Sequence, residues 1–131
     1  MLSNTLDTSH GLLLEGSLTV PTDNAAPVGL YLEHAPNVGV AIIVRPNGVT
    51  EFGPMREDGS EFKAENRVDR QATFTGEVPF RLLMKGSLLE FYLNDHLMQC
   101  WRLPSNSTGR IGLIGPQVNA IRDLKAWNSL P

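Results

Sequence analysis

Apolar and polar residues alternate with a period of two along most of this chain, which is the pattern of half-buried β-strands. In the first such segment apolar or small residues occupy every second position from Leu14 to Val20, with Glu15, Ser17 and Thr19 between them. Alternation or a short apolar run predicts the remaining strands. They are Val28–His34, Val38–Val44, Val49–Phe52, Phe80–Lys85, Leu88–Leu93, His96–Leu103, Thr108–Gly115 and Val118–Trp127, with a further strand starting at Ala72–Phe74.

Turn-forming residues separate these segments. Pro46-Asn47-Gly48 and Asn94-Asp95 each stand between two predicted strands, and Asn, Asp and Gly tolerate the positive φ angles of tight reversals. The charged stretch 53–71 is irregular and is expected to be a long loop or a weak edge strand. Apolar spacing in Asn119–Trp127 would also suit a helix, but we prefer a strand. About ten short strands predict an all-β protein, an antiparallel two-sheet β-sandwich of jelly-roll type in which residues 1–131 form a single domain.

Composition narrows the classes of partner. The chain has 131 residues, enough for a core without disulfides, and its net charge of −3 argues against nucleic acid or an anionic membrane as the main partner. One cysteine excludes an internal disulfide framework and a CxxC-type zinc site. No apolar run approaches the ~20 residues of a membrane span. The start of the chain lacks a signal peptide, which fits either a cytoplasmic protein or a module of a larger secreted enzyme.

Catalytic patterns are missing from the sequence. No pair of acidic residues alternates along a predicted strand as the two carboxylates of a sandwich glycosidase would. There is no G-x-S-x-G and no H-E-x-x-H motif. His10, His34 and His96 lack the spacing of metal ligands, so no metal-binding residue is predicted. We therefore expect a protein that is not an enzyme.

The hairpin Leu88–Leu103 carries the first candidate binding surface. A two-residue turn at Asn94-Asp95 or Asp95-His96 predicts one face that combines two aromatic rings with a carboxylate and an amide, a mixture suited to sugars. That face holds Glu90, Tyr92, Gln99 and Trp101. The opposite, core-facing side is predicted to hold Leu89, Phe91, Leu93, Met98 and Cys100. The alternative is that Tyr92 and Trp101 simply pack under a neighbouring loop.

A second polar set flanks the earlier strands. Tyr31 and Glu33 alternate with apolar residues, and Arg45 leaves its strand just before the turn. An arginine can donate paired hydrogen bonds to vicinal hydroxyls, so Glu33 and Arg45 join the predicted sugar-binding residues. The alternative is a surface ion pair of Arg45 with Glu33 or Glu51.

The C-terminal half resembles a known family. Residues 80–95, FRLLMKGSLLEFYLND, are similar to the "LR-x-x-x-x-x-S-x-x-E-x-[FY]-x-ND" signature of the concanavalin A-like sandwich that follows the catalytic propeller in family 32 glycoside hydrolases. The segments TGRIGL (108–113) and LKAW (124–127) are similar to the end of that module. Galectins are sandwiches of similar length, but their H-x-N-x-R and W-G-x-E motifs are absent.

The resemblance implies a function without catalysis. It suggests a carbohydrate-binding module accessory to a glycan-degrading enzyme, with a fructan or plant glycan as partner and a location outside the cell. The alternative is a structural module that docks on and stabilises the catalytic domain of a glycoside hydrolase. Such sandwiches often carry Ca²⁺, although the oxygen-rich cluster that this ion needs is not visible as a motif.

Overall fold

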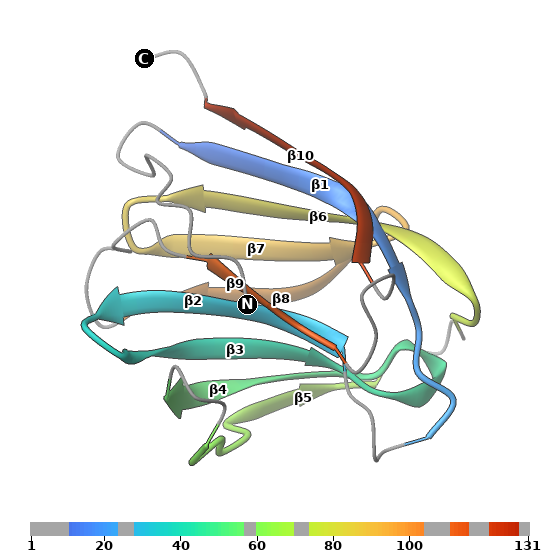
Figure 1. Ribbon diagram of the computed structural model, residues 1–131, viewed down its shortest axis with the longest axis horizontal. Helices are drawn as coiled ribbons and strands as arrows, with labels where there is room; N and C mark the ends of the chain where they lie inside the picture. The colour runs from blue at the N-terminus through green and yellow to red at the C-terminus, as the bar shows by residue number, and fades with distance from the viewer. Residues whose placement is uncertain are drawn as a thin grey trace.

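A computed structural model of the protein describes residues 11–23, 28–56, 60–69, 74–103, 111–115 and 121–128. Two five-stranded antiparallel sheets lie in two layers (Figure 1). The first sheet has the order β10-β1-β6-β7-β8, and the second has the order β5-β4-β3-β2-β9. The prediction of an all-β, two-sheet antiparallel sandwich is confirmed.

The strand bounds follow the sequence pattern closely. They are β1 (Leu12–Thr19), β2 (Val28–Ala35), β3 (Val38–Val44), β4 (Thr50–Arg56), β5 (Asn66–Val68), β6 (Glu77–Lys85), β7 (Leu88–Leu93), β8 (His96–Arg102), β9 (Ile111–Ile114) and β10 (Ile121–Asn128). The preference for a strand near the C-terminus is confirmed by β10. The stretch 53–71 contains the end of β4 and the short edge strand β5, while Ala72 lies outside the described residues and Phe74 is not in a strand.

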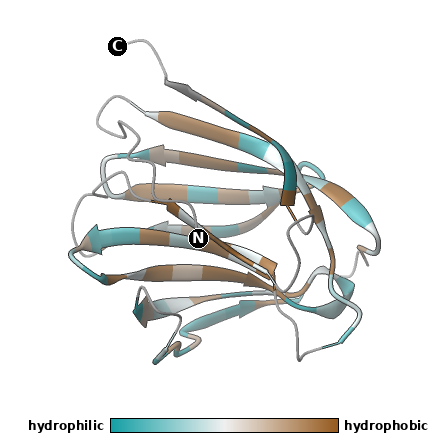
Figure 2. Ribbon diagram, viewed as in Figure 1, coloured by the Kyte–Doolittle hydropathy of each residue, from teal (hydrophilic) through white to brown (hydrophobic). Residues whose placement is uncertain are grey.

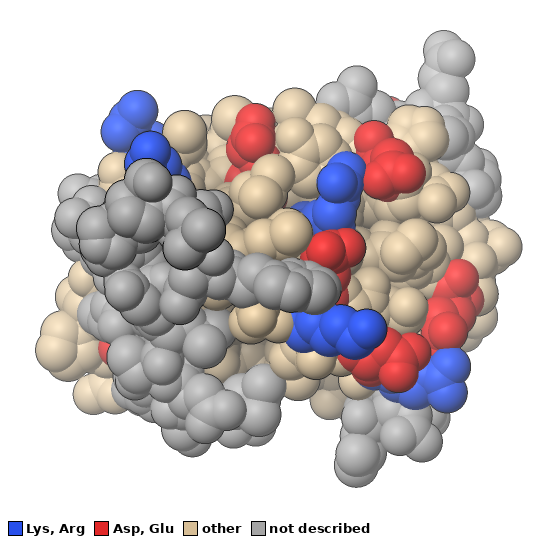
Figure 3. All heavy atoms as spheres, turned by 90° about the horizontal axis from the view of Figure 1, so that it is seen from above, with Lys and Arg blue, Asp and Glu red and all other residues tan. Residues whose placement is uncertain are grey.

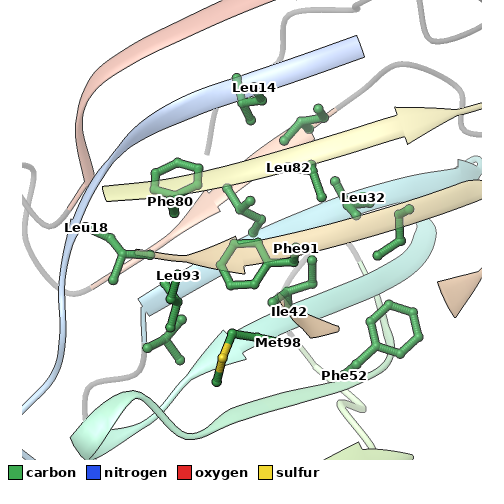
Figure 4. Close-up of a cluster of buried hydrophobic side chains, with 14 of the residues drawn as sticks. Leu14, Leu18, Leu32, Ile42, Phe52, Phe80, Leu82, Phe91, Leu93 and Met98 are labelled. Carbon is green, nitrogen blue, oxygen red and sulfur yellow. The ribbon is translucent and has the colours of Figure 1, made fainter. Parts of the chain in front are cut away.

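The core lies between the two sheets (Figure 4). Along β6 every second side chain from Val78 to Met84 is buried, because a strand turns successive side chains to opposite faces. Figure 2 shows apolar stretches on strands of both layers. Burying one such Leu or Phe side chain contributes about 1.5–3 kcal/mol. The fully buried apolar side chains of this core include Leu12, Leu18, Leu30, Leu32, Ile42, Phe80, Leu82, Leu89, Phe91, Leu93 and Met98.

Tight turns join the neighbouring strands where the sequence predicted them. At the β7–β8 reversal Asn94 and Asp95 have φ angles of 47° and 67°. Two successive positive φ angles are typical of the hairpin turn whose twist matches that of the strands. This turn pairs Leu93 with His96 and sets the starting register of the hairpin.

The edge strand β10 is held in the first sheet by backbone pairing with β1 and by an ion pair with β6. Its register with β1 shifts between Glu15 and Ser17, and Asp123, in β10, has a φ angle of 56°. Arg122 approaches Glu77 of β6 to 2.6 Å. The hydrogen bond to Glu77, together with its negative charge, raises the pKa of Arg122 above its ordinary value.

Candidate functional site

The four-residue face predicted for the β7–β8 hairpin does not form. Tyr92 pairs with Leu97, but Phe91 pairs with Gln99, so Met98 is an extra residue on β8. Such a β-bulge turns the rest of the strand by one position and exchanges its two faces. Glu90 and Tyr92 therefore remain outside the sandwich, whereas Gln99 is 2% exposed and lies inside it. The prediction that they share one face with Trp101 is wrong.

The bulge also changes the position of the cysteine. Cys100 pairs with Glu90 across the hairpin and is exposed, so the prediction that it lies on the core-facing side is wrong. Met98, predicted for the same side, is 2% exposed and belongs to the core. Only the outcome for Cys100 follows from the extra residue, because Met98 lies on the core side in the regular register too.

Gln99 forms the centre of a buried polar network between the two sheets, which we call the Gln99 network. Its Nε2 donates to Thr50 Oγ1 at 3.0 Å and to the Thr50 carbonyl at 3.4 Å. Its Oε1 accepts hydrogen bonds from Asn66 Nδ2 at 2.8 Å and from Trp101 Nε1 at 3.1 Å. The network therefore connects β8 of the first sheet with β4 and β5 of the second.

Trp101 contributes its ring to the same interface. The indole stacks on Phe52 of β4 with ring centroids 5.1 Å apart and an interplanar angle of 11°. Its only ring N–H points to Gln99, away from any sugar outside the sandwich. Trp101 is thus a packing residue, as in the alternative, but it packs on strand β4 of the opposite sheet and not under a loop.

Glu90 and Tyr92 lie on the outer face of the first sheet, where they meet Arg81 and Asp95. We call these four residues the Tyr92 surface. The Tyr92 hydroxyl donates to Glu90 Oε1 at 3.4 Å, and the Arg81 guanidinium lies 5.0 Å from the centre of the Tyr92 ring. Arg81 is also bonded to Asp95 at 2.9 Å. Seen from above, from the side where β10 and β1 lie in Figure 1, basic and acidic side chains are interspersed (Figure 3).

The outer face of the second sheet carries a second, smaller apolar cluster. Tyr31, Ala41, Ile43 and Met55 are buried on this face, and Phe62 and Ile114 pack against them. The chain approaches closely at Gly53, where an added Cβ would lie 1.8 Å from the carbonyl oxygen of Lys63. Glycine at this position lets the segment before β5 lie directly against β4.

Charged side chains border that apolar cluster and form the strongest candidate site. Arg45 Nε lies 2.7 Å from Glu51 Oε1, and the two side chains are 26% and 17% exposed. Arg67 of β5 is opposite Glu51 in the strand register and lies 3.9 Å from Asp69. We call Arg45, Glu51, Arg67 and Asp69 the Arg45 cluster. The predicted ion pair of Arg45 with Glu51 is confirmed.

Glu33 belongs to the same outer face but lies at its other end. It pairs with Gly39 near the β2–β3 turn, whereas Arg45 follows the opposite end of β3. Glu33 is 3% exposed, and its Oε2 accepts a hydrogen bond from the backbone N–H of Asn37 at 3.3 Å. Since Asn37 has a positive φ of 61°, this bond helps to hold the turn.

Two further features that would bear on function are a group of metal-binding side chains and a helix that crosses a membrane. Within the described ranges, no group of three or more His, Cys, Asp or Glu side chains is arranged to hold a metal ion. Nor does this part of the chain contain a helix long and apolar enough to cross a membrane.

No family model and no curated protein matches the sequence. Solved structures do match over nearly the whole chain, and three galectins illustrate the likeness. A toad ovary galectin in complex with N-acetylgalactose has a TM-score of 0.69 and 12% identity, over 95% of this chain and 96% of its own. Xenopus laevis galectin-Ib has a TM-score of 0.69 and 14% identity, over 97% of this chain and 98% of its own. Sheep galectin-11 in complex with glycerol has a TM-score of 0.70 and 8% identity, over 96% of this chain and 95% of its own.

These matches show that the chain has the galectin jelly-roll fold. The concanavalin A-like sandwich predicted from the sequence is therefore correct. The finer resemblance, to the module of family 32 glycoside hydrolases, receives no support from them. At such low identity the likeness concerns the fold alone.

Sequence reasoning missed several residues of these sites. Thr50 and Asn66 are inward-facing partners of Gln99, and Arg67 joins the Arg45 cluster. The sequence predicts Glu51 only as an ion-pair partner of Arg45. Residues 65–70 contain one apolar residue, Val68, so no alternation distinguishes a strand from a loop in this segment.

Proposed function

We propose that this protein is a non-catalytic lectin that binds glycans at the Arg45 cluster. The observation that carries the proposal is the Arg45–Glu51 pair at 2.7 Å beside an apolar cluster on the outer face of the second sheet. The fold of galectins supports it, because two toad ovary galectin structures are complexes with N-acetylgalactose and thio-digalactose.

The chemistry of the cluster suits a sugar. Arginine N–H groups donate and carboxylate oxygens accept, so a fixed pair of the two can bind neighbouring hydroxyl groups. Arg67 is more exposed, at 61% of its side chain, and extends the polar strip to the edge strand. Partly buried Phe62 offers an apolar surface to the C–H groups of a ring.

Two segments that keep part of the spacing of the absent galectin motifs support the choice of face. In Ala41-Ile42-Ile43-Val44-Arg45 only the arginine of H-x-N-x-R is present, and Phe62-Lys63-Ala64-Glu65 keeps the spacing of the aromatic and acidic residues of W-G-x-E. Ala41, Ile43 and Phe62 belong to one cluster on the outer face. Since Ala41 and Ile43 cannot bind hydroxyl groups, we expect a sugar preference different from that of proteins with the complete motif.

Binding is tested with immobilised glycans that include galactosides, fructans and plant polysaccharides, followed by calorimetry. Arg45→Ala and Arg67→Ala should each weaken binding about tenfold, which corresponds to ~1.4 kcal/mol. Arg102→Ala is the matched control, because this exposed arginine lies on β8 of the first sheet. A wild-type protein that binds none of these glycans, or variants that bind like the control, would contradict the proposal.

The Tyr92 surface is a second candidate, favoured by the fixed contacts between Tyr92, Glu90 and Arg81. Here the aromatic ring and the carboxylate predicted from the sequence do lie together. If this surface binds the glycan, Tyr92→Ala abolishes binding while Arg45→Ala leaves it unchanged. The same calorimetric titrations therefore distinguish the two faces.

Of the six predicted sugar-binding residues, we propose Arg45 as a direct contact of the main site and Glu90 and Tyr92 as contacts of the second candidate. Glu33 and Gln99 are buried, and Trp101 directs its N–H inward, so we assign these three residues supporting roles. Release of reducing sugar from any bound glycan by the purified protein would contradict a purely binding role.

A role beside a glycoside hydrolase, as an accessory or docking module, remains a prediction from the family 32 resemblance, as does a location outside the cell. Stability of a neighbouring catalytic domain, measured with and without this sandwich, tests docking. Loss of enzyme stability without loss of substrate binding would support docking over glycan binding.

A further inference from the structure

The Gln99 side chain uses its complete hydrogen-bonding capacity. A primary amide has two N–H donors and an oxygen with two acceptor sites. Nε2 makes two contacts to Thr50, and Oε1 accepts from Asn66 and Trp101. Because the indole nitrogen of Trp101 only donates, it requires the oxygen of the amide to face it. The orientation of the amide is thereby determined, and Nε2 must face Thr50.

Two partners of Gln99, Thr50 and Asn66, are immediate sequence neighbours of residues in the Arg45 cluster. Thr50 precedes Glu51 in β4, and Asn66 precedes Arg67 in β5. Successive residues of a strand project to opposite faces, so Thr50 and Asn66 point inward while Glu51 and Arg67 point outward. Gln99 therefore holds, from inside the sandwich, the two backbone segments that present a carboxylate and a guanidinium outside.

Apart from the bond to Gln99, β5 is attached by its pairing with β4 and by Val68, which packs against the core. It has three residues, lies at the edge of the second sheet and pairs with β4 at three positions, Thr50–Val68, Glu51–Arg67 and Phe52–Asn66. Short edge strands with few buried contacts are the parts of a sheet that open most easily. The 2.8 Å bond from Asn66 to Gln99 connects β5 directly to the opposite sheet.

We propose that Gln99 is a positioning residue for the Arg45 cluster: through Asn66 and Thr50 it fixes Arg67 and Glu51 at the separation needed to bind a glycan. This inference rests on the proposed function for its ligand. It concerns a residue that makes no contact with the glycan itself and that lies on the other sheet.

The test compares variants of the whole chain in the binding of thio-digalactose, the sugar bound by a toad ovary galectin. Gln99→Met keeps the length of the side chain and removes all four hydrogen bonds. Asn66→Ala removes only the bond to β5 and serves if Gln99→Met does not fold. We expect the dissociation constant to rise about tenfold in each variant.

Two controls distinguish the positioning role of Gln99 from a general effect on stability. Leu14→Ala destabilises the core from the first sheet, and we expect no change in affinity from it. In an Arg67→Ala background, Asn66→Ala should weaken binding by less than about twofold, because the residue through which it acts is already missing. Unchanged affinity in Gln99→Met and Asn66→Ala, or an equal loss in Leu14→Ala, would overturn the inference.

Amide hydrogen exchange decides the case if the wild-type protein does not bind the sugar. Residues 65–68 should exchange faster in Gln99→Met and Asn66→Ala than in Leu14→Ala. Faster exchange of residues 65–68 without sugar binding would support the role of Gln99 in positioning β5. It would contradict only the proposed ligand. Equal exchange in the three variants would overturn the positioning role.

Discussion

The interior of this sandwich contains a side chain that most cores would exclude. Gln99 is 2% exposed between two sheets of mainly apolar residues, and all its polar atoms are paired. A buried polar group without a partner costs about 1–3 kcal/mol, so each group in such a network depends on the others. The amide is tolerated because its partners from three strands are already in place.

Replacing Gln99 should therefore lower stability more than its size suggests. Gln99→Met leaves polar groups of Thr50, Asn66 and Trp101 without their partner, and we expect the free energy of unfolding to fall by about 2–4 kcal/mol. Urea unfolding followed by circular dichroism measures this change. Arg102→Met, on the same strand but exposed, should stay within about 0.5 kcal/mol of the wild type.

Gly53 is a second position where one residue controls its surroundings. A Cβ there would lie 1.8 Å from the Lys63 carbonyl oxygen, so Gly53→Ala must push the segment before β5 away from β4. We expect a loss of about 3 kcal/mol in the free energy of unfolding. Gly76→Ala is the comparison, because a Cβ there meets no atom within 4 Å and only the positive φ of 70° causes strain. An equal or smaller effect at Gly53 would show that the close approach is unimportant.

Among the elements, β8 shows most clearly how one residue changes a face. Met98 is the extra residue that turns Gln99 and Trp101 into the sandwich and Cys100 out of it. Its own burial shows that the bulged residue still contributes to the core. The bulge is thus a specific feature of the hairpin with consequences for every residue that follows in the strand.

Deleting Met98 should remove the bulge and leave Leu97 opposite Tyr92 and Gln99 opposite Phe91, so the faces of the second half of β8 should not change. The loss of the buried Met98 side chain should still lower the free energy of unfolding by about 2–5 kcal/mol. Tryptophan emission in a Trp127→Phe background should keep its wavelength without denaturant. Met98→Leu, which keeps the residue count, should change the free energy of unfolding by less than about 1.5 kcal/mol.

The sequence predicts the strands and their tight turns well, but it does not predict the bulge in β8. β3, β7 and the Asn94-Asp95 turn were predictable because alternation and turn chemistry agree in those segments. The bulge was not, since Leu97 and Met98 are both apolar and either could face the core. Gln99 is a polar residue of a type usually found outside, and only its partners on β4 and β5, distant in the sequence, explain its burial.

The candidate site could be predicted only in part, because contacts between segments distant in the sequence leave no local pattern. Arg45 and its pairing with Glu51 lie within one hairpin, where local spacing is informative. Arg67 reaches the cluster through the three-residue strand β5, and the charged segment around it has no hydrophobic period to identify. Sites built from several short, polar segments are therefore visible only after folding.

At the scale of the whole molecule, the two sheets share one apolar core. Leu82 lies in the first sheet and Leu32 in the second, and both are fully buried in the same cluster. Since each sheet buries its inner face only against the other, neither should be stable alone. We therefore expect both sheets to unfold together.

Leu82→Ala and Leu32→Ala test this cooperativity. Each substitution should lower the free energy of unfolding by about 2–5 kcal/mol, because it leaves a cavity in the shared core. In each variant, circular dichroism and tryptophan emission should report a single transition, and the two signals should have the same midpoint. Separate midpoints for the two signals would show that the sheets unfold independently.

The outward turn of Cys100 has a practical consequence. It is the only cysteine of the chain, it is exposed, and it lies on the first sheet, whereas the Arg45 cluster lies on the outer face of the second. A maleimide reagent would therefore attach a fluorophore, or tether the protein to a sensor, at one defined point. Such a tether would present the Arg45 cluster to dissolved glycans without any engineered substitution.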